Sequence, residues 1–330
     1  MNQIFFAIIG VVFLVVLSTS LPYAHADQNA QMFQDNTSSI VQNGPLSCNC
    51  VAFRLEYVED HYLNNVQDAI INTFKDKGDS LTIGLLGKDI GANAKVVGLL
   101  KDRLNNNNPP IELANRGWDN LDHTQYAEDE QSASIKMSSD KISRIFGVTP
   151  TVFMPPYNKF NNDTITAVHE NGIKYMSASS ISDPAPYNIH NTVLFHVPQT
   201  SLITYLLEDD PFFRGSINDK ALAKIRLSLN STGFSVVSIR SEDFAVQNGD
   251  NYNNQVDATK LQSLESLLDF LKSNGIKTVT IDQIPQMQIS QNSPKWTNNL
   301  YTWYQTGQIS YDDVISAIDY LIEQNIIKSN

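Results

Sequence analysis

A short apolar run near the start of the chain ends in acidic residues and a histidine. Residues 51–55 read VAFRL, and Glu56, Glu59, Asp60 and His61 come directly after them. Carboxylates and imidazoles are the groups that proteins use for general acid–base catalysis and for holding metal ions. A buried strand that ends in such groups is typical of the edge of an active site. The sequence therefore raises the question of whether chemistry still takes place at this edge.

Polar residues also follow later strand-like runs. In a parallel barrel, the residues that carry out chemistry lie at the carboxyl ends of the strands. Besides Glu56 and Tyr57, the polar stretches at such positions are RGWDN (116–120), PPYN (155–158), DP (183–184) and RSED (240–243). These stretches are the candidates for one shared site.

Strand-like and helix-like runs alternate along residues 48–284. The strand-like runs are 51–55, 81–86, 111–115, 151–154, 174–178, 193–197, 234–239 and 277–281. The helix-like runs are 63–77, 93–104, 129–146, 161–171, 220–229 and 257–273, and several are followed by glycine. Such alternation indicates βα units and a parallel sheet, and about seven or eight units in one domain predict a (β/α) barrel.

The amino terminus has the pattern of an export signal. An apolar run over residues 4–17 precedes Ala24-His25-Ala26, so residues 1–26 are predicted to be a signal peptide. An uncleaved signal anchor is the alternative, because no lysine or arginine precedes the apolar run. In both cases we expect a secreted or cell-surface protein. The mature chain contains no window apolar enough to span a bilayer.

The remaining segments outside the barrel are polar or short. Residues 27–47 are predicted to be a polar linker, and residues 285–295 a connector. Residues 296–330 are predicted to form a small helical tail whose apolar stripes pack on each other. A role in ligand stacking for Trp296 and Trp303 is the alternative.

Charge and cysteine content narrow the class of protein. The formal net charge of −12, without a Lys/Arg cluster, argues against nucleic acid and anionic membrane surfaces as partners. Export would permit a disulfide between Cys48 and Cys50, but a bridge over one intervening residue requires a bent backbone. A disulfide and two unpaired thiols therefore both remain open. A single C-x-C pair is too few ligands for a structural zinc site.

Several ordered blocks resemble one known family. VAFRLEYVED, ELANRGWDN, VFMPPYNKFNNDT and SVVSIRSEDFAV look like the NodB-homology polysaccharide deacetylases, in particular a secreted archaeal branch. The resemblance covers residues 48–284. It implies an α/β fold, namely a distorted (β/α) barrel of the polysaccharide-deacetylase type, here followed by the short helical tail. It also implies metal-assisted removal of acetyl groups from sugar polymers.

The resemblance assigns catalytic roles to positions that are substituted here. The position of the family's general base is Glu56, and that of its metal-binding aspartate is Tyr57. The two metal-binding histidines fall on Arg116 and Asn120, and the late general-acid histidine falls on Arg240. Every expected metal ligand is therefore changed.

The family's Pro-Pro-aromatic segment is retained. It comprises Pro155, Pro156 and Tyr157, and the resemblance implies that a backbone N–H at Tyr157 stabilises an oxyanion. Met154 stands where the family often has an arginine. The residues expected to line a sugar-binding cleft are Trp118, Pro155, Pro156, Tyr157 and Tyr187.

The substitutions argue against a bound metal. A catalytic zinc site needs about three protein ligands, and arginine cannot be one because it stays protonated. We therefore expect no cofactor, although the family uses a divalent metal such as zinc. Glu56 would then need another positive partner, so we expect Arg116 or Arg240 to lie within about 4 Å of it.

Other acids and histidines nearby leave a shifted metal site as an alternative. They are Glu59, Asp60, His61, Asp119, Asp122 and His123. A simpler interpretation is that Glu59 and Asp60 favour the amino terminus of the helix that follows. Isolated histidines such as His61, His123 and His196 are more often structural residues.

The sequence predicts an exported, deacetylase-like protein that is catalytically degenerate. Its expected partner is an acetylated polysaccharide or a cell-surface glycan. One alternative is an active metal-dependent deacetylase with altered ligands. Another is a structural envelope protein without a sugar ligand.

Overall fold

The computed structural model describes residues 48–179, 194–210 and 213–284. The predicted signal peptide, linker, connector, helical tail and Tyr187 all lie outside these residues. No helix within them is long and apolar enough to cross a membrane.

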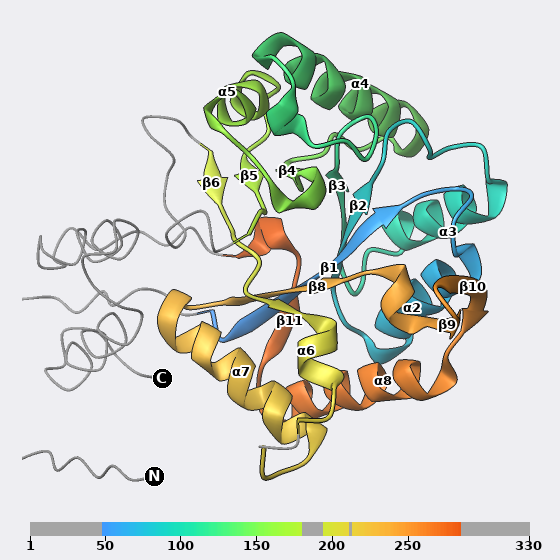
Figure 1. Cartoon of the computed structure of the whole chain (residues 1–330), viewed down its shortest axis with the longest axis vertical. Coiled ribbons are helices and arrows are strands. Elements are labelled where there is room, and N and C mark those ends of the chain that lie inside the picture. Colours follow the sequence, from blue (N-terminus) through green and yellow to red (C-terminus); the bar gives the residue numbers. More distant parts are fainter. Residues whose placement is uncertain (1–47, 180–193, 211–212, 285–330) are drawn as a thin grey trace, which may run out of the picture. The chain divides into compact units, whose positions relative to one another are not determined.

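Parallel strands form one sheet at the centre of the described chain (Figure 1). Its neighbours run in the order β6-β5-β4-β3-β2-β1-β8-β7, and β11 pairs with β1 outside this path. The strands are β1 (Cys50–Val58), β2 (Leu81–Leu85), β3 (Ile111–Asn115), β4 (Val152–Phe153), β5 (Tyr175–Met176), β6 (Phe195–His196), β7 (Ser201–Leu202), β8 (Ser235–Ile239) and β11 (Lys277–Val279).

The two ends of this strand order are consecutive in the sequence. β6 pairs with β5, and β7 pairs with β8, yet only residues 197–200 separate β6 from β7. This short connection carries the chain from one end of the sheet to the other. A bridge between Ser179 and Gln199 continues the pairing of β5 with β6 into this connection. The sheet is thus closed into a distorted (β/α) barrel, as the sequence predicts.

The longest strand, β1, has three partners. Its first residues pair with β11, its last with β2, and residues 51–55 pair with β8 along the other edge. Alternate residues point to opposite faces of a strand. Phe53 and Leu55 belong to the hydrophobic core that also includes helix residues, whereas Ala52 packs with Val236 and Met154 on the other face.

Helices surround the sheet (Figure 1). The predicted helices are present as α2 (Asn64–Lys77), α3 (Ala94–Asn105), α4 (Glu128–Phe146), α5 (Asn162–Glu170), α7 (Ile217–Thr232) and α8 (Ala258–Ser273). Phe74 of α2 packs edge-on against Phe53 of β1, with ring centroids 5.2 Å apart. Three of the predicted terminal glycines, Gly78, Gly147 and Gly233, cap helices in the left-handed conformation.

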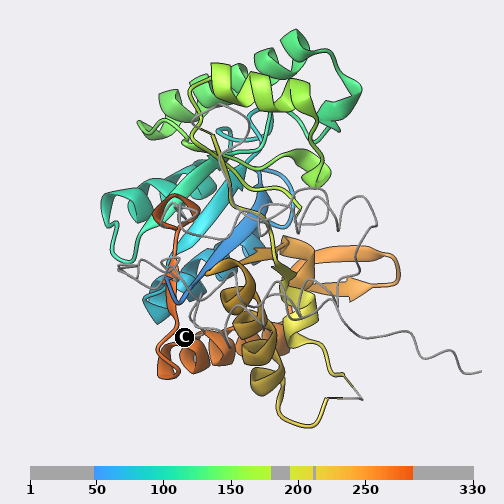
Figure 2. The same ribbon diagram turned by 90° about the vertical axis from the view of Figure 1, so that its left-hand side faces the viewer.

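The structure adds elements that the sequence did not predict. The short helix α6 (Ile203–Leu207) follows β7, and β9 (Ala245–Asn248) pairs with β10 (Asn251–Val256) as an antiparallel hairpin. The hairpin projects beyond the helices in Figure 2. Four predicted strands are also shorter than expected: β4, β5 and β6 have two residues each, and β11 has three.

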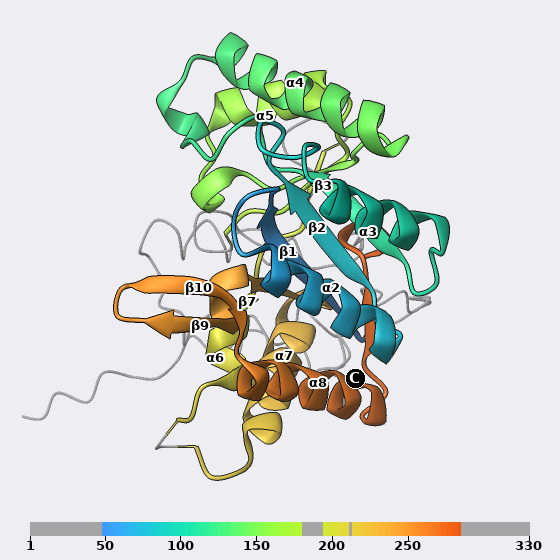
Figure 3. The same ribbon diagram turned by 90° about the vertical axis from the view of Figure 1, so that its right-hand side faces the viewer.

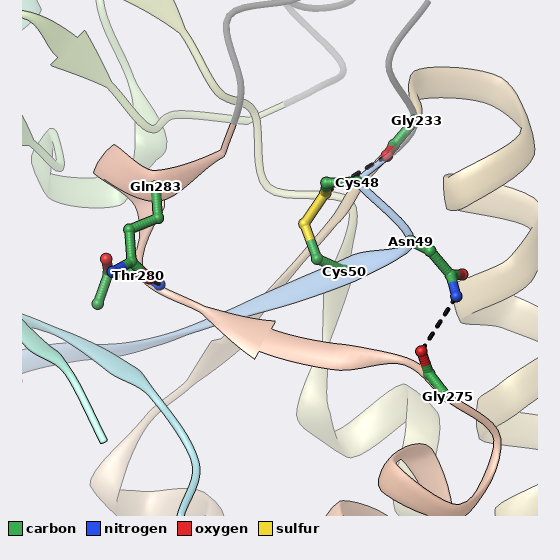
Figure 4. The surroundings of a disulfide bond; sticks show 7 residues. All are labelled: Cys48, Asn49, Cys50, Gly233, Gly275, Thr280 and Gln283. Atoms are coloured by element: carbon green, nitrogen blue, oxygen red, sulfur yellow. Dashed lines mark hydrogen bonds between the residues drawn. A yellow bond between two sulfur atoms is a disulfide. The ribbon is translucent and has the colours of Figure 1, made fainter. Parts of the chain in front are cut away.

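Cys48 and Cys50 are joined by a disulfide, which settles the alternatives left open by the sequence (Figure 4). Asn49 between them has a φ of 42° and donates its side-chain amide to the carbonyl of Gly275 at 3.1 Å. The backbone N–H of Cys48 bonds the carbonyl of Gly233 at 3.1 Å. The bridged turn therefore ties the start of β1 to the residues that precede β8 and β11.

Candidate functional site

The carboxylate of Glu56 lies between two guanidinium groups. Its Oε1 is 3.0 Å from Nη2 of Arg54, and its Oε2 is 3.1 Å from Nη2 of Arg116. The three residues are almost fully buried, with exposed fractions of 6% for Glu56, 0% for Arg54 and 3% for Arg116. The expectation that Arg116 or Arg240 pairs with Glu56 is thus confirmed for Arg116. We refer to Arg54, Glu56 and Arg116 as the buried ion triad.

Arg54 is the member of the triad that sequence reasoning missed. It lies two residues before Glu56 on β1, so both side chains point to the same face of the strand. Ala52 precedes them on that face and packs in the barrel interior. Arg54 also donates to four residues from other segments, namely Asn158, Ser177, Gln199 and Ser238.

Arg116 is held more loosely than Arg54. Its guanidinium carbon lies 5.3 Å from the centre of the Tyr57 ring, a cation–π distance. Within the described residues, its Nε and Nη1 are buried without a hydrogen-bond partner. The ion pair with Glu56 is therefore the main polar contact of this side chain.

The triad fixes the charge of Glu56. Burial alone would raise the pKa of its carboxyl, but the charges of Arg116 and Arg54 outweigh burial and lower the pKa below its usual value. Burial also lowers the pKa of Arg54 to about 10, which leaves the guanidinium charged at neutral pH. Glu56 is thus a salt-bridged carboxylate rather than a base poised near neutral pH.

Tyr57 and Arg240 have partners other than Glu56. Tyr57 donates its hydroxyl to Oε1 of Glu242 at 2.5 Å, and burial raises the pKa of the phenol, as does this bond. Arg240 forms an ion pair with Asp243 at 3.0 Å, and 47% of its side chain is exposed. Arg240, the other candidate partner of Glu56, therefore pairs with a carboxylate three residues later in the same turn.

The family-equivalent metal positions do not fit a metal ion. Arg116 and Tyr57 are tied into the contacts above, with the Tyr57 hydroxyl donated to Glu242, and the third position, Asn120, offers a neutral amide oxygen. Within the described parts of the chain, no group of three or more His, Cys, Asp or Glu side chains could hold a metal. The residues present at this site therefore fit a guanidinium-filled centre and not a dication.

The residues considered for a shifted site have other contacts. Asp60 accepts the backbone N–H of Ala92, so it braces the loop before α3. His61 is exposed. Asp122 forms an ion pair with Lys159 at 2.8 Å.

His123 and His196 are structural, as the sequence predicted. His123 is 2% exposed, and its ring nitrogens lie 3.1 Å from the carbonyl of Leu121 and from the Ser134 hydroxyl. His196 is fully buried and accepts the backbone N–H of Ala178.

The retained Pro-Pro-Tyr segment forms a short turn, η3 (Pro156–Asn158). Tyr157 has a φ of 57°, and 59% of its surface is exposed. Asn158 anchors the turn, because its side chain accepts from Arg54 and donates to Gln199 at 2.9 Å. The buried triad therefore supports the loop that presents the tyrosine ring.

The surroundings of Trp118, and a depression elsewhere on the surface, support sugar binding less than the exposed Tyr157 ring does. The Trp118 ring is half-buried, and the Lys141 ammonium lies 5.4 Å from its centre, so one face of the ring is occupied. A depression of about 310 Å³ lies between α7 and α8 and takes no residue from the strand ends. Its lining residues are Ser216, Ile217, Asn218, Thr259, Gln262, Ser263 and Ser266.

Two family models match the chain. Residues 47–176 match the polysaccharide deacetylase model, and residues 121–295 match the model of glycosyl hydrolase family 57. The ranges overlap, and together they span the whole parallel sheet described above. No curated protein matches the sequence.

Solved structures with a similar fold have low sequence identity. The CE4 domain of a multidomain xylanase from the hindgut metagenome of Trinervitermes trinervoides is 15% identical, with a TM-score of 0.45 over 71% of this chain and 87% of that one. A peptidoglycan N-acetylglucosamine deacetylase is 17% identical, with a TM-score of 0.47 over 74% and 91%. A CE4 family pseudoenzyme from Bacillus anthracis is 12% identical, with a TM-score of 0.46 over 71% and 64%.

The closed parallel sheet, with its polar residues at the carboxyl ends of the strands and its Pro-Pro-Tyr turn, defines an α/β barrel protein of the deacetylase type. Residues 47–176 of the chain match the polysaccharide deacetylase family, and its later part, residues 121–295, matches glycosyl hydrolase family 57.

Proposed function

We propose that this chain is a catalytically inactive, deacetylase-like protein that is exported and binds acetylated polysaccharide at or outside the cell surface. The observation that carries this proposal is the buried ion triad. A deacetylase of this family needs a free carboxylate base beside a divalent metal. Here the carboxylate is neutralised by two guanidinium groups, and neither Tyr57 nor Arg116 can serve as the expected metal ligand.

The loss of the metal removes two contributions to catalysis. A bound metal lowers the pKa of water and polarises the carbonyl that is attacked. The residues of this chain supply neither effect, because the position beside Glu56 is filled by arginine side chains that are 0% and 3% exposed. What remains on the surface is the Tyr157 ring, and aromatic rings pack well against the C–H faces of sugars.

The test combines metal analysis, catalysis and binding on the mature chain. We expect no stoichiometric zinc, cobalt, nickel or iron, no change of Tm with chelator, and no acetate release from acetylated chito- or xylo-oligosaccharides. We also expect these oligosaccharides to bind, and Tyr157→Ala to weaken the binding while leaving Tm unchanged. Tyr205→Ala is the matched control, since Tyr205 is similarly exposed at 56% and lies on α6.

The outcomes distinguish the three possible functions, namely an inactive glycan-binding protein, an active deacetylase and a structural envelope protein. Tight metal together with chelator-sensitive acetate release would replace this proposal by an active deacetylase with altered ligands. Absence of any glycan binding would favour a structural envelope protein. A gain-of-metal variant provides a positive control for the assignment of positions: Arg54→Thr, Glu56→Asp, Tyr57→Asp, Arg116→His and Asn120→His together should bind zinc.

A further inference from the structure

A buried carboxyl group on β3 takes no part in the candidate site. Glu112 lies in register with Thr82 of β2, and its Oε2 accepts the Thr82 hydroxyl at 2.9 Å. Only 8% of Glu112 is exposed, and its Oε1 is buried without a hydrogen-bond partner among the described residues. Burial in such surroundings penalises the charged carboxylate and favours the protonated, neutral form.

The same carboxyl oxygen holds the last turn of the described chain. This turn, η5 (Ile281–Gln283), follows β11, and Figure 3 shows the chain running from α8, in orange, toward it, in red. The backbone N–H of Ile281 donates to Oε2 of Glu112 at 3.1 Å and to the Thr82 hydroxyl oxygen at 3.0 Å. Within the described parts of the chain, the other hydrogen bonds of η5 are local to the turn. Glu112 and Thr82 are therefore its polar anchors on the sheet.

The apolar side chains of the turn pack into the interior of the barrel. Ile281 is 0% exposed and the next residue after the turn, Ile284, is 4% exposed. Both belong to the cluster that contains Ala52 of β1, Ala114 of β3 and Val236 of β8. If η5 moved away, water would reach this cluster and the Glu112 carboxyl. The position of the turn and the ionisation of Glu112 are therefore coupled, because the carboxylate gains hydration only when the turn opens.

The charged groups on the surrounding elements add to the effect of burial. Burial and the like charge of Asp282 in η5 raise the pKa of Glu112 to about 8, although the hydrogen bonds to Oε2 oppose this rise. Cations on the adjoining elements have other partners: Arg54 of β1 pairs with Glu56, Arg103 of α3 bonds the carbonyl of Pro109, and Lys272 of α8 pairs with Asp79. The neutral form of Glu112 therefore predominates at neutral pH while the turn is closed.

We propose that Glu112 is a proton-dependent anchor for η5: its neutral carboxyl keeps the turn on the sheet, and loss of the proton to solvent favours release of the turn. When the turn opens, the pKa of Glu112 returns to its usual value of about 4.5, whereas it is about 8 in the closed state. Opening should therefore become more favourable by up to about tenfold per pH unit between these two values and change little above pH 8. This inference is independent of the proposed glycan binding.

Amide hydrogen exchange of the full mature chain, measured at several pH values and corrected for the intrinsic exchange rate, tests the anchor. Protection of the η5 amides should fall by up to about tenfold per pH unit between about pH 5 and 8 and then level off. Glu112→Gln keeps an acceptor for the Ile281 N–H but cannot ionise, so protection should not depend on pH. Asp282→Asn removes the like charge, so protection should level off at a lower pH.

Asp79→Asn is the matched control for loss of a buried carboxylate. Asp79 is 3% exposed and accepts the Thr278 hydroxyl of β11 at 2.8 Å, one strand before the turn. It makes no hydrogen bond to η5 within the described residues, so Asp79→Asn should leave the pH dependence of the η5 amides as it is in the unmodified chain.

Three results would overturn the proposal, and the first two need no variant. The first is protection of the η5 amides that stays constant with pH in the unmodified chain. The second is equal protection of the η5 amides and of the Leu113 amide in β3 at every pH, because exchange would then report unfolding of the whole sheet and not release of the turn. The third is a pH dependence that persists in Glu112→Gln and disappears in Asp79→Asn, which would assign the titration to Asp79.

Discussion

Replacing Glu56 by glutamine should destabilise the fold strongly, because it removes the only anion of the buried ion triad. Removing one partner of a buried ion pair typically costs about 3–5 kcal/mol, since a buried charge is left uncompensated. Here the exposed fractions are 6%, 0% and 3% for Glu56, Arg54 and Arg116, so solvent cannot replace the lost charge. Arg54 keeps its other hydrogen-bond acceptors, but Arg116 keeps only the face of Tyr57. We therefore expect a loss near the lower end, about 3 kcal/mol.

The source of that loss can be assigned with a second substitution. Arg116→Met removes the less supported cation and leaves the pair of Arg54 with Glu56 intact, so it should cost less than Glu56→Gln. Combined with Glu56→Gln, it should recover part of the loss, because residues in contact give non-additive changes. Urea unfolding at pH 7, followed by circular dichroism, gives the free energies of unfolding of the unmodified chain, the two single variants and the double variant.

The pH dependence of the same variant gives an independent check. The folded pKa of Glu56 is lowered, so its stabilising contribution is present above the unfolded pKa of about 4.5 and is lost as pH falls through the folded value. The difference in unfolding free energy between the unmodified chain and Glu56→Gln should therefore shrink in acid. A difference below about 0.5 kcal/mol at pH 7, the size typical of a neutral surface change, would refute the triad as a stabilising centre.

Further predictions concern the start of β1, the barrel interior and the loop after β3. Replacing both Cys48 and Cys50 by serine should lower the free energy of unfolding by only about 1–2 kcal/mol, because the closed loop is very short; a loss above about 4 kcal/mol would contradict this loop-entropy account. Burial, with Asp282 nearby, raises the pKa of Glu112 to about 8, so its contribution is fully present below about pH 4.5 and is lost as pH rises through about 8. Glu112→Gln should accordingly make the free energy of unfolding less sensitive to pH between 5 and 9. An unchanged pH dependence of the unfolding free energy would contradict this role of Glu112. Gly117→Ala should cost about 1–3 kcal/mol by thermal unfolding, because φ is 84° and the added carbon would lie 2.6 Å from the His123 ring; an unchanged Tm would show that this loop adapts.

The sequence predicted the order of strands and helices because period and turn signals are local. β1 and the helices with terminal glycines follow directly from these signals. The route by which residues 197–200 connect the two ends of the sheet could not be predicted, because the two-residue strand β7 leaves no periodicity. The β9–β10 hairpin was missed because β10 is rich in asparagine and exposed on both faces, although Asn248 and Gly249 carry a turn signal.

The candidate site was predicted only where the resemblance supplied its positions. Arg116 was expected beside Glu56 because a carboxylate without a metal needs a cation. Arg54 was overlooked because it lies within an apolar run, where only the alternation with Ala52 and Glu56 shows that it faces the barrel interior. Arg240, the other candidate partner of Glu56, pairs instead with Asp243 in its own turn.

The position of Arg54 restricts which sequences the fold can reach by single changes. Its guanidinium donates hydrogen bonds to Asn158, Ser177, Gln199 and Ser238. It therefore connects β1 with the loops that meet at the strand ends. Restoring one metal ligand at a time leaves that cation, or its acid, without a partner in the interior. Each single substitution toward a metal centre should therefore give a less stable protein. Replacing the residues together would avoid this loss of stability. If the proposed function is right, the positive charge beside Glu56 comes from arginine side chains that are part of the chain itself.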